Sequence, residues 1–210
     1  ERTRGAMAAA KAKKLLGENI EGSGFSLDIH VKLGGGSYLC GEEFALIESL
    51  EGKRGFPRIK PPYPAEHGVF GQPTVVNNVE TLSHVPEILR RGPDRYRHIG
   101  TDGSPGTKIF TLCGDIEKPG YYEVEMGAPL KKILDDLGGG TKDKKPLQTV
   151  LCGGAAGTFI PANQLDVPMD FDSLKERGFL LGSGALIVLA GKRNLGDFLV
   201  DILRFFHHES

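Results

Sequence analysis

The sequence predicts an α/β segment over residues 1–100, a small α+β domain over residues 101–191 and a final helix over residues 192–210. Three observations support this order. Helical and strand-like patterns alternate around glycine turns in the first part, a hairpin pattern and a helix occupy the second, and an amphipathic pattern ends the chain. With 210 residues, 39% of them hydrophobic, the chain is long enough for one large or two ordinary domains.

The first part is predicted to contain a helix, a strand, a glycine turn and a second helix. Residues 7–16 are rich in strong helix formers and end at Gly17, a common helix stop. Residues 25–31 alternate apolar and polar side chains, which indicates a strand. Three glycines at residues 34–36 follow, and residues 42–50 then have helical spacing.

A proline-rich segment follows the second helix. Residues 52–78 carry five prolines and little periodicity, which predicts a long ordered loop with polyproline-like geometry. Loops of this length in compact domains are usually functional. Asn78 can cap the next helix, which extends to Gly92, with Pro86 in the first turn of its second part.

The pattern changes after residue 100. Residues 107–113 and 121–125 predict a hairpin, residues 130–137 predict a helix, and strands are expected near Val150 and over residues 186–189.

The last residues predict an amphipathic helix that continues to the end of the sequence at Ser210. Its apolar residues recur at helical spacing: Leu195, Phe198, Leu199, Ile202 and Leu203. A single helix with so wide an apolar face needs a packing partner.

Composition argues against several classes of function. The net charge of -1, from 26 basic and 27 acidic residues, gives no field that attracts nucleic acid or an anionic membrane. No stretch approaches the roughly 20 apolar residues that cross a bilayer, and the first five residues lack a signal core, so we expect a cytosolic protein. The spacing of Cys40, Cys113 and Cys152 fits neither a disulfide framework nor a CxxC metal site.

The most informative stretch for chemistry is residues 34–43, where glycines precede the adjacent carboxylates Glu42 and Glu43 at a helix start. Glycines let a flat ring or a phosphate approach the backbone. Two carboxylates repel phosphate, however, and serve better as acceptors for ribose hydroxyls or flavin N–H groups. The alternative is a tight turn with an acidic helix start that the helix dipole favours.

The proline-rich loop contains candidate nucleotide contacts, which are Lys53, Arg54, Arg58, Lys60 and Tyr63. These residues indicate either a solvated basic loop or a cation and an aromatic face for a nucleotide. Residues 72–81 then place two side-chain amides and a hydroxyl at a loop-to-helix junction. Helix capping and amide contacts to a flavin are the two interpretations of that junction.

No metal site is expected. Asp166, Asp170 and Asp172 lack the glycine and the distal glutamate of a calcium-binding loop. On a helix, the adjacent His207 and His208 point in different directions and do not form a metal-binding pair.

Four ordered motifs carry a resemblance to a known family: residues 37–43, 49–55, 57–64 and 73–82. Together they resemble the FMN- and NADH-binding flavoprotein subunit of respiratory complex I and of related NAD-dependent hydrogenases and formate dehydrogenases. The likeness continues through residues 165–174 and 181–185, so it covers nearly the whole chain.

The resemblance implies a finer fold assignment. Residues 1–100 would be a partial Rossmann-like FMN/NADH domain, residues 101–191 a β-grasp domain of the soluble-ligand-binding type, and residues 192–210 the first helix of an iron-sulfur helical bundle. The implied reaction is hydride transfer from NADH to FMN, followed by electron delivery to iron-sulfur clusters. Because the cofactor carries this chemistry, we nominate no catalytic acid or base.

The resemblance also implies a set of FMN-binding residues: Tyr38, Gly41, Glu42, Val76, Asn77, Asn78 and Thr81. Glu43 would face the adenosine ribose of NADH, Tyr63 would stack near adenine, and Lys60 would assist in the same pocket. A carboxylate beside the ribose hydroxyls repels a 2′-phosphate, which favours NADH over NADPH.

The sequence departs from the family pattern at both ends. Family members carry a second glycine-rich flavin loop upstream of the position of Glu1, and a cysteine-rich motif for a [4Fe-4S] cluster after the position of Ser210. We therefore expect a truncated family member without the cluster ligands. Phe44 replaces a small polar residue and Tyr63 replaces a phenylalanine, which changes one pocket wall and preserves stacking.

The partners implied are NADH and the iron-sulfur subunits of a multi-subunit redox complex, with no nucleic acid and no membrane insertion. The implied location is cytoplasmic, peripheral to the inner membrane through that complex. Quinone, protons, carbon dioxide and ferredoxin remain equally compatible terminal acceptors. Two alternative functions stay open: a non-catalytic module that binds a nucleotide or another ligand, and a scaffold that docks redox subunits.

Overall fold

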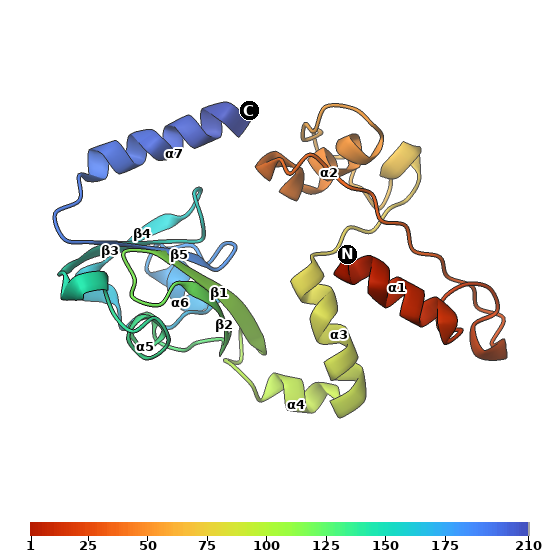
Figure 1. The fold of residues 1–210 in the computed structure, drawn as a ribbon, viewed down its shortest axis with the longest axis horizontal. Helices are drawn as coiled ribbons and strands as arrows, with labels where there is room; N and C mark the ends of the chain where they lie inside the picture. Colours follow the sequence, from red (N-terminus) through yellow and green to blue (C-terminus); the bar gives the residue numbers. More distant parts are fainter. Residues whose placement is uncertain (210) are drawn as a thin grey trace. The chain divides into compact units, whose positions relative to one another are not determined.

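The computed structural model describes residues 1–209 (Figure 1). The chain divides into two compact units, Glu1–Val76 and Asn77–His208. Its five-stranded mixed sheet lies wholly within the second unit. Among residues 1–209, none of the helices combines the length and the apolar character that a membrane crossing needs.

The first unit contains helix α1 (Arg2–Ala12), helix α2 (Glu43–Leu50) and short turns of 3-10 helix. Both predicted helices are confirmed, but α1 ends at Ala12, before the glycine that was expected to stop it. Lys14 adopts a left-handed φ of 57°, and the N–H of Leu15 donates to the carbonyl of Ala10 at 2.9 Å. This is the hydrogen bond of a Schellman helix end, formed with lysine in the place that glycine usually takes.

The strand predicted over residues 25–31 is not formed. Leu27 pairs with Gly17 in an isolated bridge, and the side chain of Phe25 is 61% exposed. Alternation in a sequence indicates a strand with one buried face, but a strand needs a neighbour to satisfy its backbone groups. No strand within residues 1–76 supplies that neighbour, so the helix, strand and helix order predicted for the first part is wrong at this step.

The second unit opens with helix α3 (Val79–Arg91) and helix α4 (Pro93–Arg97). The predicted cap is confirmed, because the side chain of Asn78 accepts a hydrogen bond from the N–H of Glu80 at 2.7 Å. Pro86 was predicted in the first turn of a continuation of this helix, and it lies in the interior of a continuous α3. A proline in a helix interior removes one hydrogen-bond donor, which α3 tolerates without ending.

The sheet of the second unit has the strand order β2, β1, β5, β3 and β4. The strands are β1 (Thr107–Gly114), β2 (Gly120–Glu125), β3 (Leu147–Cys152), β4 (Thr158–Pro161) and β5 (Ala185–Ala190). Strands β1 and β2 form the predicted antiparallel hairpin, and β5 runs parallel to β1 and antiparallel to β3. The predicted strands near Val150 and over residues 186–189 are confirmed, whereas β4 was not anticipated.

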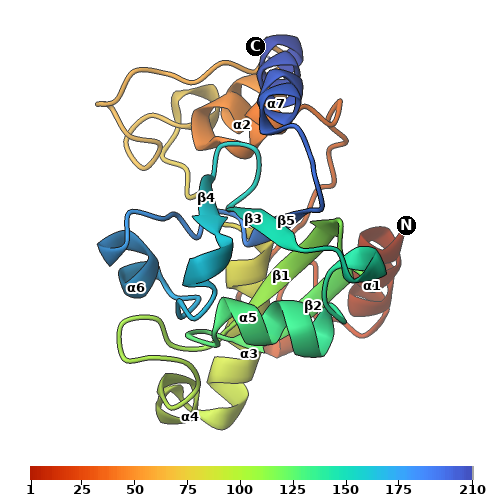
Figure 2. The same ribbon diagram turned by 90° about the vertical axis from the view of Figure 1, so that its left-hand side faces the viewer.

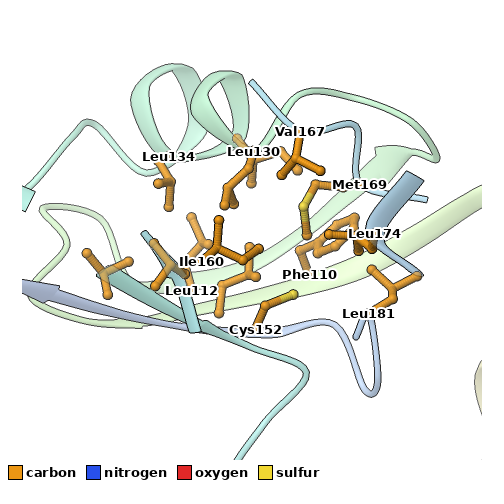
Figure 3. Packing of buried hydrophobic residues seen from close by; sticks show 14 of the residues in the cluster. Phe110, Leu112, Leu130, Leu134, Cys152, Ile160, Val167, Met169, Leu174 and Leu181 are labelled. Atoms are coloured by element: carbon orange, nitrogen blue, oxygen red, sulfur yellow. The ribbon is translucent and has the colours of Figure 1, made fainter. Parts of the chain in front are cut away.

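The core lies between this sheet and helix α5 (Leu130–Lys132), which continues as a π-helical turn over Ile133–Leu137. Figure 2 shows α5 across one face of the sheet, and Figure 3 shows Leu130 and Leu134 directed from it toward Phe110 and Ile160. Full burial of each such side chain stabilises the fold by roughly 1.5–3 kcal/mol.

Helix α6 (Phe171–Glu176) is capped by Asp170, whose side chain accepts from the N–H of Ser173 at 2.7 Å. The predicted amphipathic helix at the end of the chain is present as α7 (Leu195–Glu209). Its predicted continuation to Ser210 lies outside the described residues.

An ion pair joins the end of β1 to the segment after β5. Arg193 donates to both carboxylate oxygens of Asp115, at 2.8 and 2.6 Å, and the N–H of Ala190 donates to Asp115 at 3.1 Å. The hydrogen bond from Arg193, with that from Ala190, lowers the pKa of Asp115. A lowered pKa means that the pair stabilises the fold above the ordinary pKa of about 3.9 and loses this effect as pH falls through the folded-state pKa.

Asp115→Asn is therefore expected to reduce the free energy of unfolding at pH 7 by about 1 kcal/mol, because Asp115 is largely buried but Arg193 is half exposed. Urea unfolding at pH 7 and at pH 2.5, a pH chosen at about one unit below the ordinary pKa, measures the effect. The matched control is Asp166→Asn, which breaks a pair with Arg177 whose carboxylate side chain is 77% exposed. Equal losses for both variants, or a loss for Asp115→Asn that does not shrink at low pH, would contradict the assignment.

Candidate functional site

The paired carboxylates of the first unit lie at the start of α2. The side chain of Glu42 caps the helix by accepting from the N–H of Ala45 at 2.9 Å, and Glu43 is the first helical residue. Lys60, from the proline-rich loop, lies 3.2 Å from a carboxylate oxygen of Glu42 and also pairs with Glu43. Hydrogen bonds to Glu43 and then to Glu42 raise the pKa of Lys60. The three side chains thus form a partly exposed cluster with one net negative charge.

Phe44 positions the cation of this cluster. Its ring is 1% exposed, and both the Lys60 ammonium and the Arg58 guanidinium lie over it, at 5.4 and 5.3 Å from the ring centroid. Cations at this distance are attracted to an aromatic face. The sequence indicated Phe44 only as an altered pocket wall; the structure adds that it supports the two loop cations.

The loop that carries Lys60 is attached to α2 by a separate charge network. Arg58 pairs with Glu48 and, at 3.1 Å, with Glu51. Glu51 also accepts from Lys53 at 2.7 Å and from the N–H of Phe70 at 2.8 Å. The Lys53 contact, with the Phe70 bond, lowers the pKa of Glu51 to about 2. Arg58 and Lys53 therefore serve to fix the loop, which is a structural role.

A cleft of about 680 Å³ lies along this network and is lined by Glu48, Glu51, Arg58 and Phe70 among others. None of the ten residues that the family resemblance assigns to FMN or NADH lines it, although the candidate nucleotide cations Lys53 and Arg58 do. Because its carboxylates are already paired with its cations, we assign the cleft to the loop attachment.

Two of the residues predicted to contact a cofactor, Tyr63 and Gly41, are accessible to a ligand. The side chain of Tyr63 is 54% exposed, and its N–H donates to Glu66 at 3.2 Å. A Cβ added to Gly41 would meet no atom within 4 Å. The backbone at Gly41 and the ring of Tyr63 can therefore be approached by a flat ligand.

The predicted residues are divided between the two units. Seven belong to the first unit, which are Tyr38, Gly41, Glu42, Glu43, Lys60, Tyr63 and Val76, and three belong to the second, which are Asn77, Asn78 and Thr81. In the first unit, Lys60, Glu42 and Glu43 are in direct contact. In the second, Asn78 performs the capping role that sequence reasoning gave as its structural alternative.

Glu80 is a positioning residue that lies within one of the four motifs but had no role predicted from the sequence. Its carboxylate accepts from the N–H of Ile109 at 2.7 Å and pairs with Lys108 at 3.1 Å, which joins α3 to the start of β1. Burial raises the pKa of Glu80, but these hydrogen bonds outweigh it and the net pKa is lowered. A carboxylate in the first turn of a capped helix was the available signal.

The cysteines and histidines provide no metal centre in the described chain. Cys40, Cys113 and Cys152 are free thiols, and burial raises the pKa of Cys152 to about 12. Within residues 1–209, no group of three or more His, Cys, Asp or Glu side chains is placed to hold a metal ion.

Comparison with known proteins adds family relationships to this geometry. Residues 1–87 match the Nuo51 FMN-binding domain, and residues 109–155 match the SLBB domain. The chain is 45% identical over 205 residues to the F 2 subunit of NADH-quinone oxidoreductase from Rhizobium meliloti (strain 1021), covering 98% of this chain and 49% of that protein. The first 87 residues thus match the Nuo51 family.

Two further relatives match nearly the whole length of this chain. The F subunit of NADH-quinone oxidoreductase from Aquifex aeolicus (strain VF5) is 46% identical, over 99% of this chain and 47% of that protein. The HndC subunit of the NADP-reducing hydrogenase from Solidesulfovibrio fructosivorans is 44% identical, over 98% of this chain and 41% of that protein. The chain thus spans about half the length of these relatives, or somewhat less.

A solved structure shares the fold of this chain. The NAD⁺-reducing [NiFe]-hydrogenase in the H₂-reduced state superposes with a TM-score of 0.76 and 40% sequence identity. The match covers 88% of this chain and 31% of the hydrogenase chain. Its level of identity indicates common ancestry as well as a common fold.

Proposed function

We propose that this chain carries part of the FMN and NADH site of a flavoprotein subunit that oxidises NADH and delivers electrons to the iron-sulfur clusters of a larger complex. The observation that carries the proposal is the cluster of Glu42, Glu43 and Lys60 at the start of α2. The cluster is partly exposed, and a glycine with open space precedes it. The names of the matched relatives support the same reaction class.

The residues fit a flavin in their chemistry. Gly41 leaves room for a ring against the backbone, and a carboxylate such as Glu42 accepts hydrogen bonds from flavin N–H groups. We assign FMN binding to Tyr38, Gly41, Glu42, Val76, Asn77, Asn78 and Thr81. When bound, FMN supplies the acceptor for the hydride of NADH. The side chains hold and orient the cofactor.

Glu43 is assigned to the ribose of NADH and Tyr63 to stacking on adenine. Ribose hydroxyls donate to the carboxylate of Glu43, and the half-exposed ring of Tyr63 offers a face to the base. Lys60 holds the two carboxylates at a fixed separation from the loop and partly neutralises them. A bound nucleotide therefore meets a placed acceptor and a nearby cation.

The finer domain assignment is part of the same proposal. Residues 1–100 would belong to a partial FMN/NADH domain, residues 101–191 would form a β-grasp domain, and residues 192–210 would be the first helix of an iron-sulfur helical bundle. The sheet order β2, β1, β5, β3 and β4 and the SLBB match support the second assignment. The proposed partners are iron-sulfur subunits, and the proposed location is cytoplasmic, peripheral to the inner membrane.

Flavin retention tests the proposal in the complete protein, with any residues that flank this sequence. After addition of FMN and desalting, we expect the visible flavin band to remain and to bleach when NADH is added without oxygen. Gly41→Val is expected to abolish retention without unfolding the chain, because the new side chain enters open space that the flavin needs. Gly5→Val, also in open space but in α1, is the control. A Gly41→Val protein that retains flavin as the unaltered protein does would refute the assignment.

A further inference from the structure

The free edge of β2 borders a groove in the second unit. β2 is the first strand in the sheet order, so within the described chain only β1 pairs with it. Between this edge and the α5 turn lies a groove of about 340 Å³. Figure 2 shows β2 and α5 next to each other on this side of the sheet. An edge strand presents backbone N–H and C=O groups that can pair with a further strand.

The floor of the groove is apolar. Val124 of β2 and Leu137 are half-buried against the core, and Ile133 is 1% exposed. Side chains of a strand alternate between its two faces, so Val124 faces α5 whereas Glu123 and Glu125 lie on the opposite face. A strand added beside β2 would have the same alternation.

The edge of β2 beside the groove is acidic. Glu123 and Glu125 border the groove from the opposite face of β2, whereas Asp136 and the cation Lys132 line it beside α5. The structure gives no ion pair to Glu125 or Asp136 within residues 1–209, and Glu123 accepts only a hydrogen bond from the Thr107 hydroxyl, at 2.7 Å. These carboxylates are therefore available to cations from outside the chain.

We propose that this groove is a docking site for a basic, extended segment of a partner protein, which adds to β2 as a sixth strand. The segment would alternate apolar residues, directed toward Ile133 and Leu137, with lysine or arginine directed toward Glu123 and Glu125. Backbone pairing gives affinity in strand addition, and the alternate side chains give specificity. The proposal does not rest on the flavin site.

A second copy of this chain does not suit the same edge. Two β2 strands paired edge to edge would bring Glu123 and Glu125 of one copy beside the same carboxylates of the other. Like charges opposite each other on neighbouring strands are destabilising. The charge of the edge therefore favours a basic partner over self-association.

A fluorescent peptide of alternating lysine and valine tests the site when titrated against the 210-residue chain and followed by anisotropy. We expect saturable binding that weakens about tenfold or more in the double variant Glu123→Lys with Glu125→Lys, since each reversal removes one attraction and adds a repulsion. The matched control is Asp102→Lys with Glu176→Lys, which changes the net charge equally at exposed carboxylates outside the groove. Circular dichroism verifies that each variant is folded.

The same peptide with its backbone amides N-methylated along one edge separates strand addition from charge attraction. Its charges are unchanged but one row of donors is lost, so we expect binding to disappear. Absence of saturable binding by the parent peptide, equal weakening in the two double variants, or equal binding of the methylated peptide would each overturn the proposal. Sedimentation that shows a dimer dissociated by the groove variant would overturn it too, by assigning the edge to a second copy.

Discussion

Gly114→Ala is expected to lower the free energy of unfolding of the second unit by about 3 kcal/mol. Gly114 ends β1 with a φ of +85°, a conformation that alanine rarely adopts. An added Cβ would overlap the carbonyl oxygen of Val188 and lie 3.0 Å from its nitrogen. Val188 is the residue of β5 that pairs with Gly114, so relief of the overlap must separate two strands in the middle of the sheet.

Gly178→Ala is the matched control for this substitution. Gly178 has a φ of +77°, but a Cβ there would meet no atom within 4 Å. It therefore carries the backbone strain alone, which costs about 1 kcal/mol. Urea unfolding of both variants measures the difference. If they lose the same stability, the contact with Val188 does not restrict the sheet and the packing argument is wrong.

Glu43→Gln is expected to lower kcat/KM for NADH by roughly ten- to a hundredfold, the effect of losing a hydrogen bond of about 1.5–3 kcal/mol to a charged group. The ratio of kcat/KM for NADPH to kcat/KM for NADH should change by more than this loss, because use of NADPH should also rise. Glutamine removes the charge that repels a 2′-phosphate, while Lys60, still paired with Glu42, remains to attract it. One matched relative is named an NADP-reducing hydrogenase subunit, so similarity to the relatives alone does not decide this preference.

Steady-state kinetics of the complete protein with both nucleotides measures the effect. Glu18→Gln, which removes an exposed carboxylate of the first unit, should leave both kcat/KM values unchanged. An unaltered ratio of NADPH to NADH use in the Glu43→Gln protein would show that Glu43 does not face the adenosine ribose. The flavin-retention result is independent of that ratio, so the two assignments can fail separately.

Local signals in the sequence predicted the elements whose ends are chemically marked. Asn78 and Glu42 cap α3 and α2 with their own side chains, and both helices lie where they were predicted. The hairpin of β1 and β2 was also predictable, because each strand is long enough to show its alternation. In these cases the residues that decide the structure are neighbours in the sequence.

The incorrect predictions concern structure decided by distant or missing neighbours. Residues 25–31 have the period of a strand, but periodicity does not reveal whether another strand is within reach. Lys14 ends α1 in a left-handed conformation that its residue type seldom adopts. β4 has four residues, which is too short for alternation to stand out from chance.

The candidate site was predictable in composition but not in its contacts. The family resemblance nominated Glu42, Glu43 and Lys60 together, whereas nothing in the spacing indicated that the buried ring of Phe44 would support Lys60. Arg58 was a candidate nucleotide cation and instead attaches the loop. Charged residues of a loop can pair with many groups, and only the folded chain determines which of them are within reach.

The central position of β5 affects how the second unit folds during synthesis. β5 is the last strand to be made, yet it lies between β1 and β3 and joins the two hairpins. Because ribosomes add roughly 5–20 residues per second, several seconds pass between the synthesis of β1 and the synthesis of β5. Until β5 is made, the edges of β1 and β3 that pair with it are open on the nascent chain. A chain stalled on the ribosome before residue 185 would therefore be prone to aggregation and suited to chaperone binding. A chain whose residue 190 has left the ribosome can close the sheet.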